Sequence, residues 1–122
     1  MSIIRKVFGS FRNAFYGLRE AFGRDVSFRL EVYGGFCVAA FVFLFWPLRV
    51  YEMVFVVLAY ALILMTELIN TAFEQVLERL HPERHELIGI GKDIASAAVL
   101  IAFLFLAFVG MLIALRYLGV LP

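Results

Sequence analysis

Three long stretches without a charged residue limit what this chain can fold into more than any other feature. They are Val32–Leu48, Met53–Thr66 and Ile94–Leu115, with 17, 14 and 22 residues. A helix crosses the hydrocarbon core of a bilayer, about 30 Å thick, with roughly 20 apolar residues. The first stretch is just long enough, and the second is long enough only if the carboxylates that follow it are tolerated in the membrane. The pattern therefore predicts three transmembrane helices.

The composition excludes several other classes of protein. Of the 122 residues, 64% are hydrophobic and 17% are charged, and so short a soluble chain has too little interior to bury that much apolar surface. Disorder is excluded because disordered chains have low hydrophobicity, whereas this chain is strongly hydrophobic. A disulfide scaffold is excluded because Cys37 is the only cysteine. The net charge of +1 gives no reason to expect a nucleic-acid partner. We expect an all-α membrane protein, since a helix satisfies its own backbone hydrogen bonds in lipid.

Residues 3–23 follow a different pattern. Apolar side chains recur there every three or four residues, and basic side chains fill many of the positions between them. This is typical of an amphipathic helix that lies in the membrane interface, and a cytoplasmic helix that packs on a partner is the alternative. A cleaved signal peptide is not indicated, because no continuous apolar core follows the early charges. The apolar set is Ile4, Val7, Phe8, Phe11, Phe15, Leu18 and Phe22.

The distribution of basic residues predicts the orientation, because lysine and arginine gather on the cytoplasmic side of membrane proteins. Six of them precede the first span and three lie in the second connection, whereas the first connection holds only Arg49. We therefore expect the N-terminus and the second connection to be cytoplasmic, with Trp46, Tyr51 and Tyr117 at the outer interface. The prolines after the first two spans are expected to end them. The expected spans are about 30–48, 52–78 and 92–117, within a single domain of residues 1–122.

Polar residues interrupt the second span in a regular way. Glu67, Asn70, Glu74 and Glu78 are spaced by three, four and four residues, so they lie within one helical stripe of about 80°. Such carboxylates are costly in hydrocarbon and usually face protein, water or a cation. Oxygen ligands at this density suit Mg²⁺, which prefers one or two carboxylates together with substrate phosphates, and a further glutamate there could act as a general base. A structural polar contact between helices remains the alternative, above all for Asn70.

The start of the third span carries a second polar set. Lys92 and Ser96 are four residues apart and share a helix face. Lysine contacts phosphate as a point charge, and Asp93 is expected to hold Lys92 in place or to approach the metal. The segment is not a P-loop, because the required GxxxxGK[ST] pattern is absent, so a nucleotide would be bound by another architecture. The alternative is the ordinary charged start of a membrane helix.

Two separated motifs in these segments resemble the prokaryotic diacylglycerol kinase family of small integral-membrane kinases. The first is Glu67-Leu-Ile-Asn70-Thr-Ala-Phe-Glu74, which fits E-x-x-N-[ST]-A-x-E. The second is Lys92-Asp93-Ile-Ala-Ser96-Ala-Ala-Val-Leu100, which fits K-D-x-x-[SA]-A-A-V-L. The segments Gly17-Leu18-Arg19, Phe28-Arg29-x-Glu31, Glu78-Arg79 and His85-Glu86-Leu87 fit the same family, and the resemblance covers about residues 11–114.

The resemblance implies a homotrimer in the bacterial inner membrane, with three transmembrane helices and one surface helix per subunit. It implies MgATP-dependent phosphorylation of a lipid hydroxyl at the cytoplasmic interface. It also implies that Glu67 is the catalytic base and that Glu74 and Asp25 are metal ligands, although Asp25 stands where Glu is common. Residues implied to contact ATP are Lys6, Asn13, Asp25, Asn70, Glu74, Glu83, Arg84, His85, Lys92 and Asp93. Residues implied to bind the lipid substrate are Arg19, Arg29, Glu31, Glu67 and Ser96.

Two lipid substrates compete within the family, diacylglycerol and undecaprenol. The stretch from His85-Glu86-Leu87 to Ser96-Ala-Ala-Val99 resembles the diacylglycerol branch more closely, so we expect phosphatidic acid as the product. A small ion-conducting membrane subunit is an alternative of a different class, because carboxylates within membrane helices also suit that role. It is disfavoured because the acidic stripe lies toward the cytoplasmic end of its helix and not at the middle of the membrane.

Overall fold

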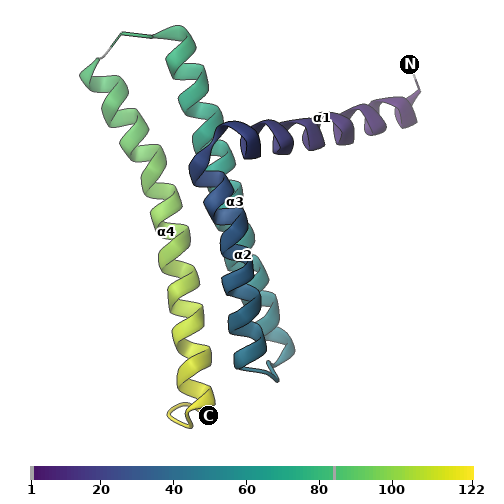
Figure 1. The fold of residues 1–122 in the computed structure, drawn as a ribbon, viewed down its shortest axis with the longest axis vertical. Helices are drawn as coiled ribbons and strands as arrows, with labels where there is room; N and C mark the ends of the chain where they lie inside the picture. The colour runs from purple at the N-terminus through teal and green to yellow at the C-terminus, as the bar shows by residue number, and fades with distance from the viewer. Residues whose placement is uncertain (1, 84) are drawn as a thin grey trace.

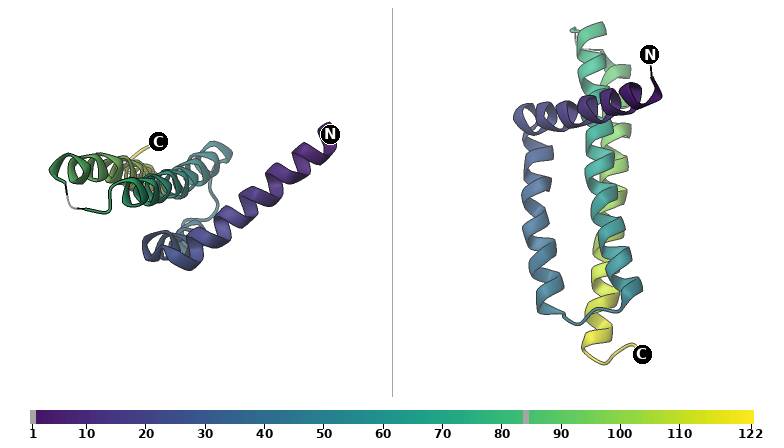
Figure 2. Two further views of the ribbon diagram at one scale, coloured as in Figure 1. Left: turned by 90° about the horizontal axis from the view of Figure 1, so that it is seen from above. Right: turned by 90° about the vertical axis from the view of Figure 1, so that its right-hand side faces the viewer.

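The computed structural model describes residues 2–83 and 85–122. The regular secondary structure in this part of the chain consists of α-helices. Three of them are long and apolar enough to cross a membrane, as predicted, and they lie side by side with alternating directions (Figure 1). The first helix runs across this common direction and projects away from the other three (Figure 2). The elements are α1 (Ile3–Arg24), α2 (Val26–Leu44), α3 (Val50–Leu80) and α4 (Glu86–Tyr117).

The first membrane helix begins and ends about four residues earlier than the predicted span of 30–48. It begins at Val26 because Asp25 caps it, with a side-chain oxygen that accepts a hydrogen bond from the Ser27 N–H at 2.9 Å. It ends at Leu44 because Pro47 disfavours helical backbone at the residue before it. One residue, Asp25, therefore separates α1 from α2.

The other two membrane helices also extend beyond the predicted spans. Helix α3 ends at Leu80, directly before the His81-Pro82 pair that was expected to end it. Helix α4 begins at Glu86, six residues before the predicted start at 92, because the His85 ring nitrogen Nδ1 accepts a hydrogen bond from the Leu87 N–H at 3.2 Å. The 31 residues of α3 are about 46 Å long at 1.5 Å per residue, which exceeds a hydrocarbon core of about 30 Å.

Helices α3 and α4 pack against each other around a small core of Val56, Val109 and Ile113. Helix α2 lies against α3. Its Phe41, together with Phe45 directly after its end, packs against this core. Many large apolar side chains on the outer faces remain exposed, including Phe36, Phe43 and Leu104. A chain with this surface requires lipid or further protein around its helices.

A close contact fixes the register of α2 against α3. The Tyr60 hydroxyl of α3 donates to the backbone carbonyls of Glu31 and Val32 on α2, at 3.0 and 3.1 Å. The ring lies over Gly35, where an added Cβ atom would stand 2.6 Å from the hydroxyl oxygen. Any larger residue at this position would therefore force the Tyr60 side chain to shift.

Candidate functional site

The site is built around the carboxylate of Asp25, at the junction of α1 and α2. One of its oxygens accepts the Ser27 N–H and so caps α2, at 2.9 Å. The other accepts a hydrogen bond from the Thr71 hydroxyl of α3. The carboxylate is thus held by two helices at once, which places it against the acidic stripe of α3.

Three further carboxylates, those of Glu31, Glu67 and Glu74, lie in the same region of α2 and α3. Glu67 on α3 is buried, with 6% of its surface exposed, and its charge interacts with those of Asp25 and Glu74. Glu31 on α2 interacts with both Asp25 and Glu67. None of the four forms an ion pair with another described residue. Four carboxylates without a basic partner repel one another, and a cation among them would relieve that repulsion.

An amide completes this group. Asn70 is 8% exposed, and its side-chain oxygen Oδ1 is buried without a hydrogen-bond partner among the described residues. Oxygen Oε2 of Glu31 is buried and unpartnered in the same way. Leaving such a group unpaired costs about 1–3 kcal/mol, so both oxygens have the character of ligand positions. The donors fit Mg²⁺, which binds to oxygen.

Protein groups alone do not enclose a metal here. Within residues 2–83 and 85–122, no three side chains of His, Cys, Asp or Glu converge as metal ligands. Asp25 and Glu74, the predicted metal ligands, are both partly buried in this group.

A second polar group lies at the far end of α3, near its connection to α4. Lys92 of α4 forms an ion pair with Glu78 of α3, with 3.2 Å between Nζ and Oε1. Both line an open groove of about 670 Å³, together with the predicted ATP contacts Glu83 and His85. At a rise of 1.5 Å per residue, Glu78 of this groove lies about 16 Å along α3 from Glu67 and about 6 Å from Glu74.

Comparison with known proteins identifies the family. The family model described as prokaryotic diacylglycerol kinase matches residues 12–114. The chain belongs to this family. It is 37% identical over 89 residues to the diacylglycerol kinase of Escherichia coli strain K12, which covers 72% of this chain and 71% of that protein. It is 35% identical over 86 residues to the diacylglycerol kinase of Haemophilus influenzae, with 70% and 72% covered. The diacylglycerol kinase of Synechocystis is 34% identical over 102 residues, with 83% and 58% covered.

Membership of the diacylglycerol kinase family makes this chain an enzyme, a lipid kinase. Its three apolar helices, together with the family, indicate a protein of the bacterial inner membrane. The carboxylate group stands about twenty residues after the start of α3, which is the length of helix that spans a hydrocarbon core.

Not every predicted site residue of the kinase reaches these two groups. Asp93 is exposed, and Glu78 takes the place that was predicted for it beside Lys92. Asp93 points elsewhere because Lys92 and Asp93 are adjacent and so lie about 100° apart on the helix. The Ser96 hydroxyl donates to the backbone carbonyl of Lys92 at 3.1 Å, which leaves it on the outer surface of α4.

The predicted residues on α1 are the furthest from the carboxylate group. Lys6, Asn13 and Arg19 are exposed, and the first half of α1 extends away from the other helices (Figure 2). Arg29 is partly buried near the site, and its Nε lacks a hydrogen-bond partner among the described residues. Arg84 lies outside the described residues. Thr71 was missed by sequence reasoning, although a hydroxyl directly after Asn70 in the motif was a signal that could have found it.

Proposed function

We propose that this kinase transfers the γ-phosphoryl group of ATP to the hydroxyl of diacylglycerol, with phosphatidic acid and ADP as products. The observation that supports it is the buried Glu67 beside Asp25, about 26 Å along α3 from its start, which is close to the thickness of a hydrocarbon core. A lipid hydroxyl lies at that depth, and a carboxylate is the group that can accept its proton. The three relatives above are each named diacylglycerol kinase.

Glu67 is the proposed base. Its carboxylate accepts the proton of the lipid hydroxyl, and the hydroxyl oxygen forms a bond to the γ-phosphorus. The bond from that phosphorus to the bridging oxygen of the β-phosphate breaks, and ADP leaves with the bonding electrons.

The remaining residues of the proposed site hold and orient the nucleotide. Bound Mg²⁺ would neutralise charge on the phosphates during transfer, and Asp25 and Glu74 are its proposed ligands. Lys92 is the proposed phosphate contact on the groove side. The proposed nucleotide contacts also include Lys6, Asn13, Asn70, Glu83, Arg84, His85 and Asp93, and the proposed lipid contacts are Arg19, Arg29, Glu31 and Ser96.

The proposed assembly is a homotrimer with a cytoplasmic N-terminus and second connection, within which residues 1–122 form one kinase domain. Two features of the single chain support it. Helix α2 has only one fully buried residue, Phe28, and Lys6 and Asn13 lie away from the chain's own carboxylate group. We place α1 in the membrane interface, since its crosswise direction (Figure 1) suits a helix that lies flat on the bilayer.

The test is transfer of labelled phosphate from ATP to lipid, with diacylglycerol and undecaprenol supplied side by side in the same detergent. Label is expected in phosphatidic acid in the presence of Mg²⁺. Glu67→Gln should abolish transfer, whereas Glu20→Gln, a matched change on α1, should retain it. Transfer to undecaprenol alone would refute the proposed substrate, and full activity of Glu67→Gln would refute the proposed base.

A further inference from the structure

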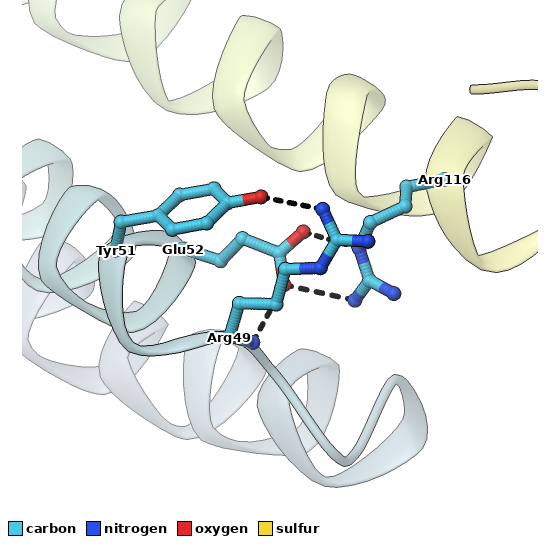
Figure 3. A network of polar contacts seen from close by, with 4 residues as sticks. All are labelled: Arg49, Tyr51, Glu52 and Arg116. Atoms are coloured by element: carbon cyan, nitrogen blue, oxygen red, sulfur yellow. Dashed lines mark hydrogen bonds and ion pairs between the residues drawn. The ribbon is translucent and has the colours of Figure 1, made fainter. Parts of the chain in front are cut away.

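A second buried charge network lies at the opposite end of the membrane helices, far from the kinase site. Glu52, in the first turn of α3, is 6% exposed. It accepts two hydrogen bonds from the guanidinium of Arg116 near the end of α4, from Nε and, at 2.8 Å, from Nη2. It also accepts the backbone N–H of Arg49 at 2.8 Å. Figure 3 shows these residues together with Tyr51.

The network contains more positive than negative charge. Two guanidinium groups, those of Arg49 and Arg116, lie near the Glu52 carboxylate, and among the described residues Arg116 alone forms an ion pair with it (Figure 3). The Arg49 side chain donates to the Tyr51 hydroxyl, a neutral acceptor, at 2.7 Å. Arg116 uses two of its five N–H groups on Glu52, because a guanidinium has five donors. The group therefore carries a net charge of +1 and retains free donors, which favours a bound anion.

An apolar cavity opens directly beside these charges. Its volume is about 300 Å³, and Tyr51, Glu52 and Arg116 form its polar edge. Its walls are apolar side chains of α3 and α4, among them Phe55, Phe108 and Leu112. These walls lead from the helix ends toward the middle of the membrane helices. A molecule that fits has an anionic group at one end and a hydrocarbon chain at the other.

We propose that this corner of the protein, formed by Arg49, Arg116 and the cavity, binds an anionic phospholipid of the leaflet opposite the kinase site. The lipid phosphate lies on the free donors of Arg49 and Arg116, and one acyl chain lies in the cavity between Phe55 and Leu112. The ends of membrane helices lie among lipid headgroups, and the net positive charge selects anionic over zwitterionic headgroups. The site is separate from phosphoryl transfer and does not depend on it.

The chain carries a natural reporter at this corner. Trp46 is the only tryptophan and lies three residues before Arg49. Its neighbour Phe45 packs edge-on against Tyr117, with 5.2 Å between ring centroids, and Tyr117 adjoins Arg116. Bromine on a lipid acyl chain quenches tryptophan fluorescence at short range, so Trp46 reports which lipids gather at this end of the helices.

The experiment uses the full chain in phosphatidylcholine vesicles that contain a rising fraction of brominated lipid. Brominated phosphatidylglycerol is expected to quench Trp46 at about one fifth of the fraction that brominated phosphatidylcholine requires. Arg49→Gln, an exposed change that should fold, is expected to remove this difference. Arg79→Gln, the same change in charge at the other end of α3, should keep it.

Inorganic phosphate added to the vesicles should leave the quenching unchanged, because it lacks the acyl chain. Equal quenching by the two brominated lipids in the wild type would overturn the proposal. That result is also the one expected if a second copy of the chain, and not a lipid, covered the cavity. A preference for phosphatidylglycerol that survives in Arg49→Gln would overturn it as well.

Discussion

Thr71 and Asp25 are 46 positions apart in the chain, yet the hydroxyl of the first donates a hydrogen bond to the carboxylate of the second. The other oxygen of the same carboxylate accepts the Ser27 N–H. Both oxygens of Asp25 are therefore oriented by the protein, one by α2 and one by α3. The orientation of a proposed metal ligand depends on a threonine that no proposed contact with substrate involves.

Replacing Thr71 with valine should lower the turnover rate about ten- to a hundredfold, because small displacements of a reacting group are costly. Thr71→Ser keeps the hydroxyl and should restore most of the activity. The measurement is phosphoryl transfer as a function of Mg²⁺ concentration, in which the valine variant should require more Mg²⁺. Direct binding of Mn²⁺ to the unreacted enzyme, followed by electron paramagnetic resonance, should weaken in parallel. Equal activity of the valine and serine variants would contradict this role.

Removing the Lys92 amine should reduce kcat with little effect on the KM for lipid. Loss of one group that stabilises transition-state charge typically lowers rates by about 10²–10³. Lys92→Arg should rescue poorly, since its geometry differs. Glu78→Gln is the matched control, because it breaks the ion pair at 3.2 Å but keeps the amine. Steady-state kinetics with ATP and lipid varied separately decide the point, and a change confined to the lipid KM would place Lys92 in the lipid site.

Adding a methyl group at Gly35 should destabilise the fold by about 1–3 kcal/mol, the usual cost of overpacking. The new Cβ would stand 2.6 Å from the Tyr60 hydroxyl and force it away from its two carbonyl acceptors. Tyr60→Phe removes that hydroxyl, so the two changes together should cost less than their sum. Unfolding by denaturing detergent in mixed micelles measures all four forms. Strict additivity would show that the two residues do not interact.

Breaking the Glu52–Arg116 pair should destabilise the chain by about 3 kcal/mol, since a lone buried charge remains. Glu52→Leu and Arg116→Met should each show this loss, and the double variant should recover most of it. The recovery is expected because apolar residues of similar volume often replace a buried ion pair without cost. Unfolding in mixed micelles again supplies the free energies. A double variant less stable than both single ones would refute the explanation.

Sequence patterns were sufficient to predict the three membrane helices, because runs of apolar residues determine which segments can enter a bilayer. The helix ends differ from the ends of the predicted spans, by four residues for α2 and by six at the start of α4. Those ends depend on local caps by Asp25 and His85, and a hydropathy pattern does not detect a single side chain that bonds to a backbone N–H.

The acidic stripe of α3 was also predicted from spacing, and its Glu67 and Asn70 are buried. The long-range contacts of polar groups in these helices could not be predicted in this way. The pairs Thr71–Asp25 and Glu52–Arg116 join residues 46 and 64 positions apart. Whether such residues meet depends on the register in which two helices pack, which Tyr60 and Gly35 help to determine and which periodicity alone leaves open.

Asp25 is the single residue between α1 and α2, so the joint between the two helices is itself a carboxylate of the proposed site. If α1 lies on the bilayer surface as proposed, a thinner or thicker bilayer changes the angle between α1 and α2. Thr71 of α3 still holds the Asp25 carboxylate by its hydrogen bond. A change in the direction of α1 therefore reaches the Asp25 carboxylate directly, because no other residue lies between the two helices.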